Sequence, residues 1–173
     1  MKKLTKSILI IGLLFVIAAC NDSSEYETKE DLELLSSFGV NVAEPSGLAI
    51  NDTGTILYTV SDNTNKIYKI STTGNVLQTF NYVGNDLEGV STYTKNKLLV
   101  AEERTKEIVS FDMTTNQVAK HKIAYDNSDA NSGIEGVAYN SDDGTIFMIN
   151  EKDPGLLLHL RSNFSILSEY NLD

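Results

Sequence analysis

The chain has 173 residues, with 14 lysines and arginines against 24 aspartates and glutamates, and its formal net charge is −10. Such an acidic surface repels phosphate backbones, so the composition argues against nucleic acid as a partner. A single cysteine excludes an internal disulfide, so the fold has to be held together by its hydrophobic core.

The N-terminus has the pattern of a lipoprotein signal peptide. Three lysines precede the uncharged run 7–19, which is short for a membrane span but matches the apolar core of a secretory signal. Small residues then precede Cys20, and this resembles the lipobox of bacterial lipoproteins, whose cysteine is acylated. We therefore expect residues 1–19 to be removed and acyl chains on Cys20 to anchor the protein in membrane lipid. The alternative is an ordinary signal peptide or an uncleaved anchor.

Polar and acidic residues follow the cysteine. Residues 20–37 are expected to form a flexible tether that lifts the folded domain, residues 38–173, off the lipid surface. The expected location is the extracytoplasmic face of the cell membrane or of the outer membrane, because the sequence does not distinguish the two.

A short motif occurs three times in the remaining chain. The sequences PSGLA, LEGVS and IEGVA align, so that Gly47, Gly89 and Gly136 are equivalent. Each copy is followed by a turn rich in Gly, Asn, Asp and Lys, an apolar run, a polar corner and two further apolar segments. Four short strands in about 40–45 residues are typical of propeller blades, here over 44–83, 86–125 and 133–171.

The predicted fold class is therefore all-β and of the β-propeller type, with three four-stranded antiparallel blades. The second strand of each unit is apolar at consecutive positions, as expected for a sheet covered on both faces. An antiparallel sandwich is the alternative, and the threefold match in order and turn type argues against it.

Three blades are fewer than the four to eight of a closed propeller. The outer faces of the first and last blades would then expose apolar surface, which soluble proteins avoid. We expect the missing cover to come from further blades of a longer form, which we favour, or from another chain. Self-association through the open blade faces is one form of the second alternative.

Four segments of these blades, NDLEGV at 85–90, VAEER at 100–104, GIEGVAY at 133–139 and NEKDP at 150–154, resemble the SdiA-regulated family. The resemblance covers about residues 40–171. It implies a β-propeller similar to calcium-dependent phosphotriesterase-like and phytase propellers, with calcium bound by a glutamate at the start of inner strands. Family members are longer and carry further blades.

The inner strands begin at acidic corners, which supply the candidate metal ligands. Glu88 and Glu135 occupy equivalent corners, and Glu44 lies near the corresponding position of the first unit. Carboxylates that converge from different blades would form an oxygen-rich site of the kind that calcium prefers. The alternative is that each glutamate caps backbone amides at a tight corner.

A second polar set lies between the second and third strands, at the same end of each sheet. Its residues could bind a small anionic ligand beside the metal, or they could form ordinary surface ion pairs. The candidates are Asp62, Glu102, Glu103, Arg104, Glu151 and Lys152.

The sequence thus predicts a lipid-anchored, extracytoplasmic propeller domain that binds calcium and a small anionic ligand. No residue is assigned a catalytic role, and whether the protein is an enzyme stays open. One alternative is a calcium-dependent hydrolase of phosphate or carboxylic esters. The other is a structural surface protein whose open blade faces dock onto a partner.

Overall fold

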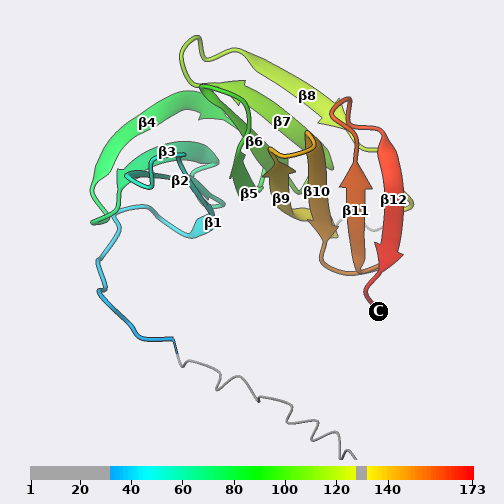
Figure 1. The fold of residues 1–173 in the computed structure, drawn as a ribbon, viewed down its shortest axis with the longest axis horizontal. Coiled ribbons are helices and arrows are strands. Elements are labelled where there is room, and N and C mark those ends of the chain that lie inside the picture. The colour runs from blue at the N-terminus through cyan, green and yellow to red at the C-terminus, as the bar shows by residue number, and fades with distance from the viewer. Residues whose placement is uncertain (1–31, 128–131) are drawn as a thin grey trace, which may run out of the picture. The chain divides into compact units, whose positions relative to one another are not determined.

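Each of the three repeat units folds into one four-stranded antiparallel sheet in the computed structural model, which describes residues 32–127 and 132–173 (Figure 1). The strands of every sheet are arranged in chain order, so each blade is a continuous meander. The predicted fold class is confirmed. The chain divides into residues Met1–Leu35 and a compact unit Ser36–Asp173 that holds all three sheets. In the described ranges, no helix has the length and apolar character needed to cross a membrane.

The strands follow the predicted segments closely. The first blade consists of β1 (Pro45–Ile50), β2 (Ile56–Ser61), β3 (Lys66–Ser71) and β4 (Val76–Val83). The second blade consists of β5 (Leu87–Thr92), β6 (Lys97–Glu102), β7 (Glu107–Asp112) and β8 (Val118–Lys122). The third blade consists of β9 (Ile134–Asn140), β10 (Thr145–Asn150), β11 (Leu156–Leu160) and β12 (Ile166–Asn171).

The first hairpin of each blade turns at a residue with a left-handed backbone. Gly54, Asn96 and Gly144 have φ angles of 69°, 62° and 74°. Glycine and asparagine adopt this conformation more readily than other residues, which is why the turn composition located the hairpins correctly.

The middle blade shows why its second strand is apolar at four consecutive positions, Leu98 to Ala101. In β6, Leu98 and Val100 belong to a hydrophobic cluster shared with the first blade, whereas Leu99 and Ala101 belong to a cluster shared with the third. All four side chains are fully buried. Burying a leucine-sized side chain stabilises a fold by about 1.5–3 kcal/mol, so packing between blades is the main source of stability. The neighbouring blades contribute Tyr58, Val60, Ile67, Phe80, Ile146, Met148, Leu158 and Leu160.

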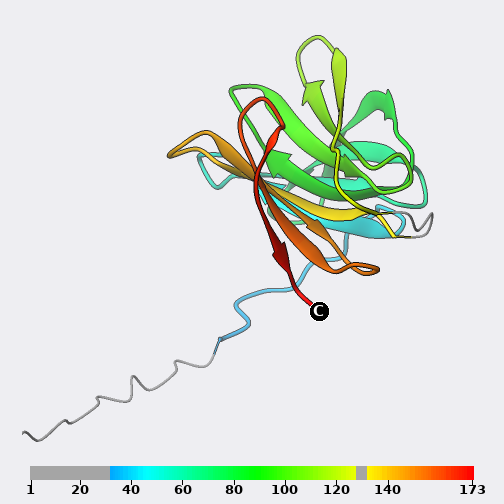
Figure 2. The same ribbon diagram turned by 90° about the vertical axis from the view of Figure 1, so that its right-hand side faces the viewer.

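The glycine of the repeated motif lets the inner strands of neighbouring blades approach each other. A Cβ atom on Gly47 would lie 2.9 Å from the carbonyl oxygen of Glu88 and from the amide nitrogen of Val90. A Cβ atom on Gly89 would lie 2.9 Å from the Cα atom of Gly136. The inner strands β1, β5 and β9 therefore lie side by side on the inside of the arc of blades (Figures 1 and 2).

The close approach at Gly89 gives the first prediction. Gly89→Ala should force β5 and β9 apart, and we expect the free energy of unfolding to fall by about 1–3 kcal/mol in chemical denaturation followed by circular dichroism. Gly39→Ala is the control, because a Cβ atom on Gly39 would meet no described atom within 4 Å. Equal losses of stability in the two variants would contradict this account.

Candidate functional site

The last residue of the second strand is polar and fully buried in all three blades. These residues are Ser61, Glu102 and Asn150, and each is 0% exposed. Buried polar groups are stable only when they are hydrogen-bonded. Ser61 shows the simplest case, because its hydroxyl donates to the carbonyl oxygen of Ala43 at 2.5 Å and accepts from the amide of Thr64 at 3.0 Å. It thereby ties the segment that leads into β1 to the turn after β2.

Both carboxylate oxygens of Glu102 have partners. The Tyr82 hydroxyl donates to Oε1 at 2.5 Å, and the Lys120 ammonium donates to Oε2 at 2.6 Å. The Thr105 hydroxyl and the Asn85 amide complete the set at 3.0 and 3.2 Å. Burial, together with the hydrogen bond to the carboxylate, raises the pKa of the Tyr82 hydroxyl. Glu102, which the sequence suggested as a ligand-binding residue, therefore lies in the interior and connects β4, β6 and β8.

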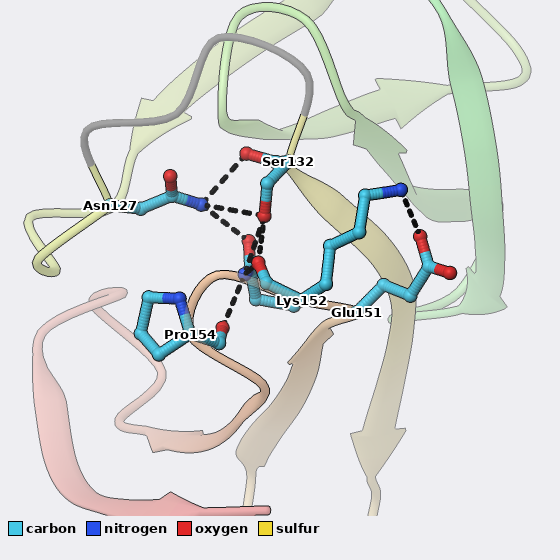
Figure 3. A network of polar contacts seen from close by, with 6 residues as sticks. Asn127, Ser132, Glu151, Lys152 and Pro154 are labelled. Carbon is cyan, nitrogen blue, oxygen red and sulfur yellow. Dashed lines mark hydrogen bonds and ion pairs between the residues drawn. The ribbon is translucent and has the colours of Figure 1, made fainter. Parts of the chain in front are cut away.

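Asn150 has the same place in the third blade. Its amide nitrogen donates to the carbonyl oxygens of Lys152 at 2.9 Å and Pro154 at 2.7 Å, and its amide oxygen accepts from Asn127 at 2.8 Å. The Ser132 hydroxyl also donates to the Lys152 carbonyl, and Figure 3 shows Ser132 and Asn127 gathered around this corner. The network fixes the start of β9 against the turn between β10 and β11.

Three carboxylates come together where the first and second blades meet. One oxygen each from Asp62, Asp86 and Glu88 lies within 4.8 Å of the other two. Asp62 follows β2, Asp86 precedes β5 and Glu88 lies in β5. These residues, which we call the acidic triad, could bind a metal ion, because hard cations take several carboxylate oxygens from neighbouring segments.

Asp86 is the most constrained member of the triad. Its backbone has a φ angle of 62°, and its amide donates to Oδ1 of Asn65 at 2.5 Å. The hydrogen bond from Asp62 lowers the pKa of the Asp86 carboxyl, and the Arg104 guanidinium, 2.5 Å from Oδ2, lowers it further. The same hydrogen bond raises the pKa of Asp62 to about 6, with help from burial and from the charge of Glu88. A proton on Asp62, held between the two carboxyls, is therefore retained up to about pH 6.

Further carboxylates extend the acidic surface from the triad towards the third blade. Burial raises the pKa of Glu88, although a hydrogen bond with Ser46 opposes the change. Burial, then the hydrogen bond to Asp86, raise the pKa of Glu103. Burial also raises the pKa of Glu135 to about 7, and the charges of Glu103 and Glu88 add to the effect. The carboxylates repel one another, and a bound cation would relieve that repulsion.

The candidate metal ligands of the sequence analysis are only partly brought together. Glu88 and Asp62 both belong to the acidic triad, although Asp62 was expected to contact an anionic ligand and not a metal. Glu44, with a φ angle of 41°, accepts the Asp62 amide through its carbonyl oxygen at 3.2 Å, and its charge contributes to the raised pKa of Asp62. Glu135 lies outside the triad but is influenced by the charge of Glu88.

The two basic candidates have acidic partners at the surface. Arg104 contacts Asp86. Lys152 contacts Glu151 at 2.9 Å, and the side chains of Lys152 and Glu151 are both about half exposed. The Lys152–Glu151 pair is drawn on the outside of the corner in Figure 3. Exposed pairs of this kind contribute about 0–1 kcal/mol, so both cations can change partners easily.

Asp86 is the functional candidate that the sequence analysis missed. Asp86 lies in the segment NDLEGV, two residues before Glu88. Its position in the polar corner directly before β5 could have indicated a metal ligand. The Tyr82–Glu102–Lys120 network carried no comparable signal, because Tyr82 and Lys120 lie 20 and 18 residues from Glu102 and meet it only through the packing of the blade.

Comparison with known proteins supports the architecture. The family described as SdiA-regulated matches residues 24–172. Similar solved structures include hydrazine synthase from Kuenenia stuttgartiensis, with a TM-score of 0.56 and 15% identity over 74% of this chain and 37% of that chain. A streptogramin B lyase has a TM-score of 0.56 and 14% identity over 78% and 43%. A protein of unknown function from Bacteroides caccae has a TM-score of 0.55 and 14% identity over 74% and 50%.

These likenesses show the fold alone, because the identities are low. The matched parts make up 37% to 50% of the solved chains, so this chain spans at most about half of the length of these relatives.

The raised pKa of Glu135 gives the second prediction. Its pKa lies above the ordinary value of 4.5, at about 7, so the folded state binds the proton more tightly than the unfolded state. The contribution of Glu135 to stability is therefore full below about pH 4.5 and is lost as the pH rises through about 7. In EDTA, Glu135→Gln should raise the Tm by a few degrees at pH 8 and change it little at pH 4.5.

The control for this measurement is Glu169→Gln, because Glu169 is an exposed carboxylate on β12, the outermost strand of the third blade. It should have no pH-dependent effect on the Tm. A Glu135→Gln variant with the same Tm as the unmodified chain at pH 8 would contradict the proposed burial of this charge.

Proposed function

The chain belongs to the SdiA-regulated family, and on this basis we propose that it is a lipid-anchored, extracytoplasmic β-propeller-type domain that binds calcium at the acidic triad. The observation that carries the proposal is the approach of three carboxylate oxygens to within 4.8 Å of one another. Asp86 stabilises a proton on Asp62 up to about pH 6, and a bound cation would take the place of that proton and relieve the repulsion between the carboxylates.

The chemistry of the triad favours calcium over magnesium. Calcium takes six to eight oxygen ligands in flexible geometry, whereas magnesium requires a near-ideal octahedron and gives up water reluctantly. Asp62, Asp86 and Glu88 come from two blades and three different backbone environments, which suits an irregular ligand shell. Arg104 competes for Asp86, but its side chain is 60% exposed and can swing away at little cost.

The location is proposed from the N-terminal pattern. Cys20 lies outside the described residues, and acyl chains on it would hold the domain at an extracytoplasmic membrane surface, either the cell membrane or the outer membrane. Calcium is bound there by modules with dissociation constants of about 10⁻⁴–10⁻³ M, so a modest site is sufficient. A small anionic ligand would bind beside the calcium, where Arg104 and Lys152 can turn towards it.

One observation favours a hydrolase of phosphate or carboxylic esters as a second candidate function. Glu135 has a pKa of about 7, which is the range in which a general base works best at neutral pH. A nearby calcium ion would polarise the ester and activate water. Turnover of an aryl ester or phosphodiester that EDTA abolishes would distinguish this enzyme from a binding domain.

Calcium binding gives the third prediction. In the EDTA-treated full chain, 10 mM calcium should raise the Tm by about 5–10 °C, because ligand at about 100 times its dissociation constant stabilises the folded state by about 2.7 kcal/mol. Magnesium should raise the Tm less. Asp62→Asn should remove most of the calcium effect, since it deletes one charged ligand and keeps the shape of the side chain.

The matched control is Asp142→Asn, which alters an exposed carboxylate in the β9–β10 hairpin. This variant should respond to calcium like the unmodified chain. If 10 mM calcium leaves the Tm of the unmodified chain unchanged, the triad is not a calcium site.

Lipid anchoring gives the fourth prediction. The chain produced in a bacterial host with a lipoprotein-processing pathway should partition into the detergent phase of a Triton X-114 extraction. Cys20→Ser should shift it to the aqueous phase, because the acylated side chain is lost. Equal partitioning of the two forms would rule out an anchor on Cys20.

A further inference from the structure

A cavity lies between the first hairpin turns of the first two blades, at the opposite end of the strands from the acidic triad. It has a volume of about 250 Å³ and is lined by residues 51–53, Tyr58, residues 92–97 and Met113. Residues 51–53 belong to the turn between β1 and β2, and residues 92–97 run from the end of β5 to the start of β6. We call this cavity the hairpin hollow.

Tyr58 contributes a buried side chain with a free hydroxyl to the hairpin hollow. It lies in β2, belongs to the hydrophobic cluster shared by the first two blades and is only 7% exposed. Burial, and then the charge of Asp52, raise the pKa of its hydroxyl, so the hydroxyl lies near the Asp52 carboxylate. Within residues 32–127 and 132–173, no group forms a hydrogen bond with this hydroxyl, which opens into the hollow. Buried tyrosine hydroxyls usually have a partner, so a ligand is the natural candidate.

The repeats indicate that the packing of the blades does not require this hydroxyl. Tyr58, Leu99 and Phe147 each occupy the third position of the second strand in their blade. The other two blades therefore use an apolar side chain where the first blade has a tyrosine. The ring of Tyr58 serves the same packing, and its hydroxyl is the additional group that remains to be explained.

The charges around the hairpin hollow have both signs. Asp52 lies in the turn of the first blade, and Lys95 and Lys97 lie on the facing hairpin of the second blade. An anion would be repelled by Asp52 beside the Tyr58 hydroxyl, and a cation would be repelled by the two lysines. The hollow therefore suits a ligand without net charge.

The hydrogen-bonding groups of the lining match a ligand that is rich in hydroxyls. Asp52 can only accept hydrogen bonds and the lysines can only donate them, whereas the tyrosine and threonine hydroxyls do both. A sugar ring carries several hydroxyls, each of which can donate to one group and accept from another. Met113 and the ring of Tyr93 provide apolar surface for the C–H groups of the sugar. A volume of about 250 Å³ lies at the small end of ligand pockets, which usually measure about 300–1,000 Å³, so it suits a single ring.

We propose that the hairpin hollow binds an uncharged polyhydroxyl ligand of the size of one sugar ring, with the Tyr58 hydroxyl and the Asp52 carboxylate as its central polar contacts. This site is separate from the proposed calcium site, because the hollow and the acidic triad share no residue and lie at opposite ends of the strands. Sugar binding in the hollow therefore does not require calcium.

The fifth prediction concerns sugar binding by the full chain in EDTA and in a detergent without a sugar headgroup. Saturation-transfer-difference NMR should detect binding of at least one of D-glucose, D-galactose, D-mannose and N-acetyl-D-glucosamine at millimolar concentration. Tyr58→Phe should raise the dissociation constant of that sugar about fivefold, because one hydrogen bond to the ligand is lost while the ring stays in place. If none of the four sugars binds, or if Tyr58→Phe binds them equally well, the proposal is wrong.

Glycine and inorganic phosphate are the comparison probes for the ligand class. Neither should give a signal that Tyr58→Phe weakens, because glycine is a zwitterion and phosphate is an anion. A Tyr58-dependent signal from glycine or phosphate, without one from a sugar, would overturn the assignment of an uncharged ligand.

Tyr82→Phe is the matched control for the hydroxyl. The Tyr82 hydroxyl donates to the buried Glu102 carboxylate at 2.5 Å, so its loss should lower the Tm by about 4 °C or more and leave sugar binding unchanged. Tyr58→Phe should show the reverse, with weaker sugar binding and no fall in the Tm. An equal fall in the Tm of both variants would assign the Tyr58 hydroxyl a structural partner and overturn the proposal. If Tyr82→Phe fails to fold, the two measurements on Tyr58→Phe decide the outcome.

Asp52→Ala tests the second polar contact. It should raise the dissociation constant of the sugar about tenfold, since a hydrogen bond to a charged group is lost. Asp142→Ala is the control, because Asp142 lies two residues before Gly144 in the third blade, as Asp52 lies two residues before Gly54 in the first. Asp142→Ala should bind the sugar like the unmodified chain, and equal binding by both variants would contradict the role of Asp52.

Discussion

A blade of this protein is an apolar sheet with two faces to cover, and the structure depends on each blade covering its neighbour. The middle blade meets this requirement completely, because alternate residues of β6 pack into two different clusters and are all fully buried. Within residues 32–127 and 132–173, the outer blades have a neighbouring blade on one side only. The same constraint therefore explains the stability of the interior and the apolar surfaces left at the two ends of the arc.

Buried polar residues connect this packing to the candidate site. Ser61, Glu102 and Asn150 end the second strands, and their hydrogen bonds hold the segment that leads into each inner strand. Because each unpaired polar atom in the interior would cost about 1–3 kcal/mol, these corners have little freedom to move. Asp62 directly follows Ser61, and Asp86 directly follows Asn85, whose amide donates to Glu102, so both carboxylates are held in place near each other.

The sequence predicted features that depend on local interactions and missed those that depend on contacts between blades. Turn residues such as Gly54 and Gly144, and the consecutive apolar residues of β6, located all twelve strands of the described chain. Glu102 looked like its neighbour Glu103, and only the approach of Tyr82 and Lys120 from other strands shows that it is structural. The acidic triad joins residues of two blades, so spacing along the chain did not show that Asp86 and Glu88 lie next to Asp62.

The central claim is that carboxylates from two blades form one cation site. Its most direct test is anomalous diffraction from crystals of the full chain grown with calcium, with magnesium-grown crystals as the reference. The account predicts a calcium peak in contact with carboxylate oxygens of Asp62, Asp86 and Glu88, with Arg104 moved away from Asp86. A well-ordered triad without an anomalous peak at millimolar calcium, still paired with Arg104, would contradict it.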